Sequence, residues 1–267
     1  MYINNQKFIP KRFSSGEMKL LSSTLDKYII NSKVEILYLN QESLFELQII
    51  INYFQSKHVK VHLILSYLPY QRMDHKGRDE LNTLKFVAQI FNSLNLENII
   101  ICEPHSEIDE FFNAKSISFV EKLFQKVKND INFGKDDYLC FTDKGSKKRY
   151  SKLYGSSIYF EKERDLNTGL ICKYNICGEF EPSKKFLIVD DIISTGDTIC
   201  SAVELLKSYG VKNIYILSGH IENNKYNKRL LEYDCVKNIY STNSLKKIGG
   251  KKLKLFDVRE IVYGEKN

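Results

Sequence analysis

The sequence predicts an α/β protein built from two related halves, each a mostly parallel sheet flanked by helices. Three observations support this prediction. Short apolar runs alternate with helical patterns, one helix-and-strand unit occurs twice, and the polar segments that could carry chemistry directly follow apolar runs. Strands that alternate with helices form crossover units, which give parallel sheets with helices packed on their faces.

Six short apolar runs are the expected buried strands. They are Val34–Leu39, Val59–Leu65, Asn98–Cys102, Tyr138–Thr142, Phe186–Val189 and Asn213–Leu217. Between the first two, Ser43 and Glu46 form an S-x-x-E capping box, which predicts a helix that runs to about Phe54.

One segment of the chain is repeated with unchanged spacing. The aligned pairs are Thr83 with Thr198, Ser93 with Ser208, Asn98 with Asn213, and His105 with His220. Each copy reads as a helix, a short break, a strand, and a histidine just past the end of that strand. The repeat therefore predicts two domains, residues 1–133 and 134–267.

Composition and the length of the apolar runs indicate where in the cell the protein is expected. The apolar share of 43% and the charged share of 27% are ordinary for a soluble globular protein. The apolar runs are much shorter than the roughly 20 residues of a membrane span, and residues 1–10 lack the features of a signal peptide. We therefore expect a cytoplasmic protein without a membrane segment. The six cysteines include no C-x-x-C pair, which argues against a disulfide framework and a zinc site.

The net charge of +7 is compatible with a nucleic-acid partner or with a phosphorylated small substrate. Lys and Arg are spread along the chain, and the local groups at Lys144–Arg149 and Lys246–Lys254 lie in no recognised nucleic-acid module. We therefore expect small-molecule substrates and no nucleic acid.

The most informative segment is Phe186–Thr198. An apolar strand delivers two adjacent carboxylates, Asp190 and Asp191, and a tight loop then enters a helix at about Asp197 or Thr198. Backbone N–H groups, hydroxyls and a helix N-terminus can bind phosphate, while carboxylates accept hydrogen bonds from sugar hydroxyls. The alternative is an acidic turn with a helix cap, but the pattern favours a phosphorylated sugar.

This segment resembles the signature of type I phosphoribosyltransferases and of ribose-phosphate diphosphokinases. Further segments, in the same order along the chain, resemble the diphosphokinases alone. They are Phe13–Glu17 (like F-x-D-G-E), Pro69–Lys76 (like P-Y-x-R-Q-D-R-K), Glu103–Glu107 (like D-L-H-A), Asp143–Ser146 (like P-D-x-G-G), Tyr159–Asp165 (like the D-K-R-R loop) and Lys252–Val262 (like the final strand and helix). The chain thus resembles a divergent ribose-phosphate diphosphokinase.

The resemblance implies type I phosphoribosyltransferase-like halves and transfer of a diphosphate from Mg·ATP to the 1-hydroxyl of a phosphorylated ribose, with release of AMP. It implies ATP-binding residues Phe13, Glu17, Arg72 and Asp74; Mg²⁺ ligands His105 and Asp143; catalytic cations Lys162 and Arg164; and ribose- and phosphate-binding residues Asp190, Asp191, Ser194, Thr195, Gly196, Asp197 and Thr198. It also implies a symmetric homo-oligomer, a dimer or a hexamer.

The phosphate loop departs from the family pattern. The family has D-T-A-G-T where this chain has Ser194-Thr-Gly-Asp-Thr198, so Asp197 stands where a dianionic 5′-phosphate would bind. Like charges repel there unless Asp197 points away as a helix cap. A 5′ diester is tolerated better, so ADP-ribose, which a branch of the family uses, is a second candidate acceptor.

Two other functions fit parts of the sequence. A type I phosphoribosyltransferase would use the Asp190–Thr198 segment and leave the segments around Arg72 and Lys162 without a role. A non-catalytic regulatory homologue would keep the fold but lose the basic loop, and the presence of Lys162 and Arg164 argues against it.

Overall fold

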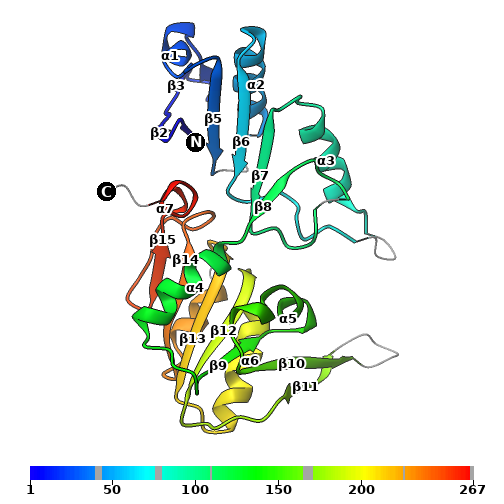
Figure 1. The fold of residues 1–267 in the computed structure, drawn as a ribbon, viewed down its shortest axis with the longest axis vertical. Helices are drawn as coiled ribbons and strands as arrows, with labels where there is room; N and C mark the ends of the chain where they lie inside the picture. The colour runs from blue at the N-terminus through cyan, green and yellow to red at the C-terminus, as the bar shows by residue number, and fades with distance from the viewer. Residues whose placement is uncertain (40–43, 76–79, 109, 165–170, 225, 265–267) are drawn as a thin grey trace. The chain divides into compact units, whose positions relative to one another are not determined.

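The computed structural model describes residues 1–39, 44–75, 80–108, 110–164, 171–224 and 226–264, without the side chains of residues 162–164, 171–173 and 226–227. The chain divides into two compact units, Met1–Ile117 and Ser118–Asn267 (Figure 1). Within the described ranges, no helix is long and apolar enough to cross a membrane.

The first unit contains a six-stranded sheet, and its strand order is β2-β1-β5-β6-β7-β8. Strands β5 to β8 are parallel, and β1 and β2 add an antiparallel edge. The elements are β1 (Tyr2–Ile3), β2 (Gln6–Lys7), β3 (Lys11–Arg12), β4 (Met18–Lys19), α1 (Ser22–Asp26), β5 (Lys33–Tyr38), α2 (Leu44–Ser56), β6 (Lys60–Leu65), α3 (Thr83–Asn92), β7 (Asn98–Cys102) and β8 (Lys115–Ile117).

Alternate residues of the central strands build the core of this unit. Val61 and Leu63 of β6 belong to one buried cluster together with Ile50 and Phe54 of α2 and Phe91 of α3. Successive strand side chains point to opposite faces of a sheet, so these helices cover the face on which Val61 and Leu63 lie.

The second unit contains a seven-stranded sheet in the order β11-β10-β9-β12-β13-β14-β15. All neighbours are parallel except the antiparallel pair β10–β11. Its elements are α4 (Phe119–Asp130), β9 (Tyr138–Phe141), α5 (Lys144–Tyr150), η2 (Ser151–Leu153), β10 (Ser157–Arg164), β11 (Ile171–Cys177), β12 (Lys185–Ile193), α6 (Asp197–Ser208), β13 (Asn213–Ile221), η3 (Tyr226–Leu231), β14 (Val236–Thr242), β15 (Leu253–Phe256) and α7 (Val258–Tyr263).

Helices cover both faces of the second sheet. Leu187 and Val189 of β12 pack in one cluster with Phe124 of α4, whereas the alternating Ile188 packs in another with Val203 of α6. The predicted fold class, two mostly parallel sheets flanked by helices, is confirmed.

The boundary between the units differs from the predicted division at residues 133 and 134. It falls between Ile117 and Ser118, so that α4 belongs to the second unit. The physical reason is that the apolar side of α4, with Leu123, Phe124 and Val127, packs against β9 and β12 in a shared core. The periodicity of a helix shows which face it buries but not which sheet will cover that face.

Most expected elements are present, with two differences. Strand β12 continues through Asp190 and Asp191 to Ile193, because these residues pair with an equally extended β13. His220 therefore lies inside β13 and is fully buried, whereas its repeat partner His105 lies past the end of β7, as predicted.

The predicted capping box of Ser43 and Glu46 stays a prediction. Helix α2 begins at Leu44, and Ser43 lies outside the described residues. The carboxylate of Glu46 is bound by the Arg12 guanidinium, with N–O distances of 2.6 and 3.0 Å. This contact ties the β3–β4 hairpin to the first turn of α2.

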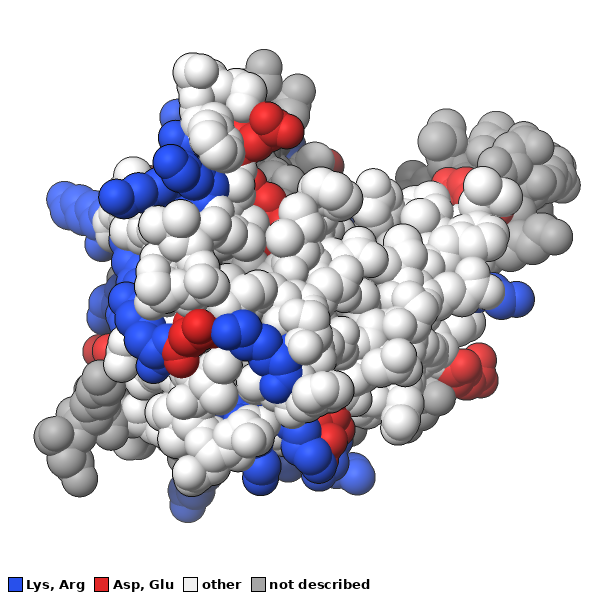
Figure 2. Space-filling model, turned by 90° about the horizontal axis from the view of Figure 1, so that it is seen from above, with Lys and Arg blue, Asp and Glu red and all other residues white. Residues whose placement is uncertain are grey.

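Charged side chains do not form a single basic surface on the face drawn in Figure 2. Acidic side chains stand among the basic ones there, around a broad uncharged area.

Truncating Phe124 tests the assignment of α4 to the second unit. The ring is 1% exposed, so Phe124→Ala is expected to lower the free energy of unfolding of this unit by about 3–5 kcal/mol. Urea denaturation gives the loss, and hydrogen exchange of the β9 and β12 amides locates it. Ile248→Ala, at a side chain that is 80% exposed in the same unit, is the control. A loss below about 1 kcal/mol for Phe124→Ala would contradict the assignment.

Candidate active site

Asp143 lies at the carboxyl end of β9, where it begins helix α5. Its Oδ1 accepts a hydrogen bond of 2.8 Å from the backbone N–H of Ser146, so Asp143 is the N-cap. Ser146 in turn donates through its hydroxyl to the backbone oxygen of Val189 at 2.8 Å, which fixes α5 against β12. A Cβ at Gly145 would lie 3.2 Å from Asp143 Oδ1, so a larger residue there would push this carboxylate from its position. The exposed carboxylate is thus held in a defined position.

The two carboxylates of β12 lie next to the α5 helix. Asp191 is 2% exposed, and its Oδ1 accepts a 2.9 Å hydrogen bond from Nη2 of Arg149 in an ion pair. Asp190 is partly buried, and its Oδ1 accepts the backbone N–H of Asp191 at 3.1 Å. The carboxyl ends of β9 and β12 therefore bring together three carboxyl groups and one guanidinium.

Burial and the neighbouring negative charge make Asp190 a weaker acid than an ordinary aspartate. Burial, followed by the charge and hydrogen bond of Asp191, raises the pKa of Asp190 well above its ordinary value. Asp143 adds to the rise and Arg149 opposes it. A group with this electrostatic environment is stabilised by an added cation or by hydrogen-bond donors such as sugar hydroxyls.

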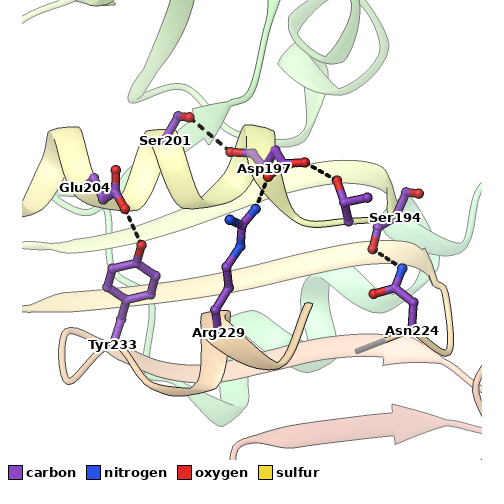
Figure 3. A network of polar contacts seen from close by, with 8 residues as sticks. Ser194, Asp197, Ser201, Glu204, Asn224, Arg229 and Tyr233 are labelled. Atoms are coloured by element: carbon purple, nitrogen blue, oxygen red, sulfur yellow. Dashed lines mark hydrogen bonds and ion pairs between the residues drawn. The ribbon is translucent and has the colours of Figure 1, made fainter. Parts of the chain in front are cut away.

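The loop after β12 leads into helix α6 through Gly196, whose φ of 83° is in the left-handed region that favours glycine. Before it, the Ser194 hydroxyl donates to Glu222 Oε2 at 2.8 Å. Asn224 Nδ2 donates to the Ser194 carbonyl at 2.8 Å (Figure 3). The segment after β13 therefore holds the loop in place.

Asp197 is the first residue of α6 and turns towards η3. Its carboxylate accepts a hydrogen bond from the Thr195 hydroxyl and forms an ion pair with Arg229 of η3 (Figure 3). Both contacts lower the pKa of Asp197, so the carboxylate is charged at neutral pH. Tyr233, just past η3, donates to Glu204 of α6 at 2.5 Å and so joins η3 to the helix.

The predicted catalytic cations lie on the β10–β11 hairpin. Lys162 is paired in register with Tyr174, and Arg164 with Ile171. The Tyr174 hydroxyl donates to the carbonyl of Thr142 at 3.1 Å, one residue before Asp143. Lys162 is therefore paired with Tyr174, whose side chain contacts the end of β9. The side chains of Lys162 and Arg164, and all of Asp165, lie outside the described part of the chain.

In the first unit, Phe13 and Glu17 lie on the β3–β4 hairpin. The backbone N–H of Phe13 donates to the Glu17 carbonyl at 2.9 Å, and the turn passes through Gly16 at a φ of 90°. The Phe13 ring is 52% exposed, with Lys19 Nζ 5.6 Å from its centroid. An exposed aromatic ring on a short hairpin can stack on a base, as its predicted role requires.

The segment after β6 contains two predicted ATP-binding residues, Arg72 and Asp74, and only Arg72 is exposed to solvent. Arg72 is exposed, whereas Asp74 is 8% exposed and its Oδ1 lies 3.5 Å from His75 Nδ1. Asn82 Nδ2 donates to the Asp74 carbonyl at 2.8 Å. Asp74 is therefore placed to support this segment, Arg72 is placed to reach a ligand, and Lys76 lies outside the described residues.

The predicted Mg²⁺ ligands belong to different units, His105 to the first and Asp143 to the second. Among the described residues, no group of three or more His, Cys, Asp or Glu side chains could hold a metal ion. Asp143 by itself is a suitable ligand, because Mg²⁺ binds proteins through one or two carboxylates and takes its other ligands from water and substrate phosphates. Uncompensated negative charge around Asp190 also favours a bound cation.

Sequence reasoning did not assign Arg149, Tyr174, Glu222, Asn224 and Arg229, which the structure places at this site. In the sequence, Arg149 belongs to the basic group Lys144–Arg149. None of these residues lies in a motif around Asp190, and each reaches the site from another element. No local pattern marks them.

The part of the second unit around the loop after β12 is similar to phosphoribosyltransferases. A family model described as "Phosphoribosyl transferase domain" matches residues 179–249. The matched residues include β12, α6, β13 and β14 of the second unit.

Relatives across most of the chain narrow the assignment. A ribose-phosphate pyrophosphokinase of Sulfurisphaera tokodaii is 27% identical over 247 residues, which are 88% of this chain and 83% of that protein. One from Staphylococcus saprophyticus is 28% identical over 248 residues, 88% of this chain and 76% of that protein. The fold matches a phosphoribosylpyrophosphate synthetase structure from Mycobacterium smegmatis, with a TM-score of 0.71, 22% identity and coverage of 86% of this chain and 79% of that one. Over most of its length the chain is therefore similar to ribose-phosphate pyrophosphokinases, as a divergent relative.

Proposed function

We propose that the protein transfers the β,γ-diphosphate of Mg·ATP to the 1-hydroxyl of a ribose that carries a phosphate-containing group on its 5′ carbon. The anomeric oxygen attacks the β-phosphorus, the bond from that phosphorus to the α-phosphate oxygen breaks, and AMP leaves. Ribose 5-phosphate and ADP-ribose are the two candidate acceptors.

The observation that carries this proposal is the group formed by Asp143, Asp190, Asp191 and Arg149 beside the entry to α6. Asp190 and Asp191 would accept hydrogen bonds from the ribose hydroxyls, and the loop from Ser194 would hold the 5′ substituent. A sugar placed there has its anomeric carbon at the carboxyl edge of the sheet, which is where ligands of open α/β sheets bind.

Positioning and electrostatics supply the catalysis in this proposal. Arg72 would bind ATP, and Phe13 and Glu17 of the β3–β4 hairpin would contact its adenine base. Lys162 and Arg164 would approach the transferring group, because negative charge grows on its oxygens in the transition state. Mg²⁺, held through Asp143 and His105, would neutralise phosphate charge when bound.

The direct test is incubation of the purified protein with Mg·ATP and each acceptor separately. AMP is measured by chromatography and the new diphosphate by ³¹P spectroscopy. AMP release with ribose 5-phosphate, ADP-ribose or both is expected. No AMP with either acceptor would contradict the proposal and favour a phosphoribosyltransferase or a regulatory protein.

Replacing a cation of the hairpin connects this activity to the chain. Lys162→Ala is expected to lower kcat by about 100-fold, because it removes a charge that acts mainly in the transition state. Lys212→Ala, at an exposed position just before β13 on the opposite edge of the sheet, is the matched control. Equal kcat values for the two variants would argue against a catalytic role for Lys162.

A further inference from the structure

Two hydroxyls of the phosphate loop, those of Ser194 and Thr195, donate to carboxylates of the protein. The Thr195 hydroxyl donates to Asp197, and the Ser194 hydroxyl donates to Glu222 Oε2 at 2.8 Å. Two groups that would otherwise donate to the acceptor's 5′ substituent therefore already have partners. Because the carboxylates of Asp197 and Glu222 lie at this loop, a ligand with a positive charge or with little negative charge is expected to bind there best.

Arg229 brings a positive charge to the same place. It reaches the loop from η3, and within the described part of the chain its guanidinium hydrogen-bonds to Asp197 alone. The Arg229 side chain is 43% exposed and that of Asp197 is 69% exposed. A guanidinium has five N–H donors, so Arg229 retains donors that face solvent beside the loop.

Stability alone does not account for this ion pair. Exposed pairs contribute about 0–1 kcal/mol, and η3 is already joined to α6 by the hydrogen bond from Tyr233 to Glu204. Arginine binds phosphate oxygens through two parallel hydrogen bonds, which makes it well suited to a phosphate ligand. A charge function therefore explains the pair better than a structural one.

We infer that Arg229 binds the phosphate-containing group on the 5′ carbon of the acceptor, and that Asp197 makes the site favour a group with one negative charge over a group with two. The inference rests on the proposed function for the position of the acceptor. The pair has no net charge, so a phosphodiester with one negative charge meets the guanidinium without net repulsion. A phosphomonoester is largely a dianion above pH 6, and its second charge is opposed by Asp197.

Ligand-induced stabilisation tests the inference without requiring turnover. The shift in Tm is measured for the full chain with ribose 5-phosphate, its singly charged methyl ester, and ribose, because a ligand that binds only the folded state raises Tm. The wild type is expected to be stabilised by both phosphorylated probes, and more by the methyl ester at equal concentration.

Two variants separate the two roles. Arg229→Gln is expected to weaken binding of both phosphorylated probes by about 10- to 100-fold, as for a lost charged hydrogen bond. Asp197→Asn is expected to strengthen binding of ribose 5-phosphate by about fivefold, and to change binding of the methyl ester less. Arg259→Gln is the control, because Arg259 pairs with Asp257 at the N-terminus of α7; it should leave binding unchanged.

Unchanged binding of both probes to Arg229→Gln would overturn the role of Arg229, as would a wild type stabilised by neither. An unchanged ratio of the two affinities in Asp197→Asn would overturn the charge selection. Wild-type binding that follows the expected pattern without AMP release would instead contradict the proposed reaction and leave the inference standing.

Discussion

Replacing Asp191 by alanine is expected to cost the protein both stability and acceptor binding. Asp191 is 2% exposed and pairs with Arg149, whose side chain is 27% exposed, at 2.9 Å. Removing the carboxylate leaves the guanidinium largely buried without its counter-charge. The expected loss in the free energy of unfolding is about 3 kcal/mol, measured from urea denaturation curves.

A double-mutant cycle separates the ion pair from the loss of packing. Arg149→Met in the Asp191→Ala background removes the uncompensated charge, so part of the lost stability should return. If Asp191→Ala alone costs less than about 1 kcal/mol, the pair is not the buried interaction that the structure describes.

The same substitution is expected to affect the acceptor and not ATP. The proposed role of Asp191 is to accept hydrogen bonds from ribose hydroxyls, and a lost hydrogen bond to a charged group weakens binding by about 10- to 100-fold. The KM of the acceptor should rise by this factor under conditions in which the urea denaturation curve shows the variant to be folded, while the KM of ATP should change little. Equal changes in both would indicate a general disruption of the site.

Replacing Asp190 by asparagine is expected to have the opposite effect on stability. The raised pKa of Asp190 means that the folded state binds this proton more tightly than the unfolded state does. Stability therefore falls as pH rises above the ordinary aspartate value of about 3.9 and until the pH passes the folded-state value. At neutral pH, Asp190→Asn removes this cost, and we expect a gain of about 0.5–2 kcal/mol together with loss of acceptor binding.

The pH dependence supplies the internal check. The stability difference between Asp190→Asn and the wild type should shrink towards pH 4 and below, where the aspartate is protonated in both states. Asp197→Asn should show the opposite sign, since the pKa of Asp197 is lowered, with a small effect because that side chain is 69% exposed. A wild type more stable than Asp190→Asn at pH 7 would contradict this account.

Local sequence patterns were sufficient for most of the secondary structure. Strand β7 spans the predicted Asn98–Cys102, and α6 begins at Asp197, within the predicted range. Both follow from signals carried by neighbouring residues, namely an apolar run in one case and a glycine before a helical pattern in the other. The end of β12 was misjudged because Asp190 and Asp191 read as residues that follow a strand, whereas pairing with β13 carries the strand to Ile193.

The sequence by itself determined the fold class, the family resemblance and the residues of the loop from Asp190 to Thr198. Only the tertiary structure decided that Asp197 faces Arg229, 32 residues away, and that Ser194 faces Glu222, 28 residues away. It also decided that α4 belongs to the second unit. The physical reason is that a motif specifies its own backbone and side chains, whereas the partner of a charged side chain depends on which distant segment the sheet brings beside it.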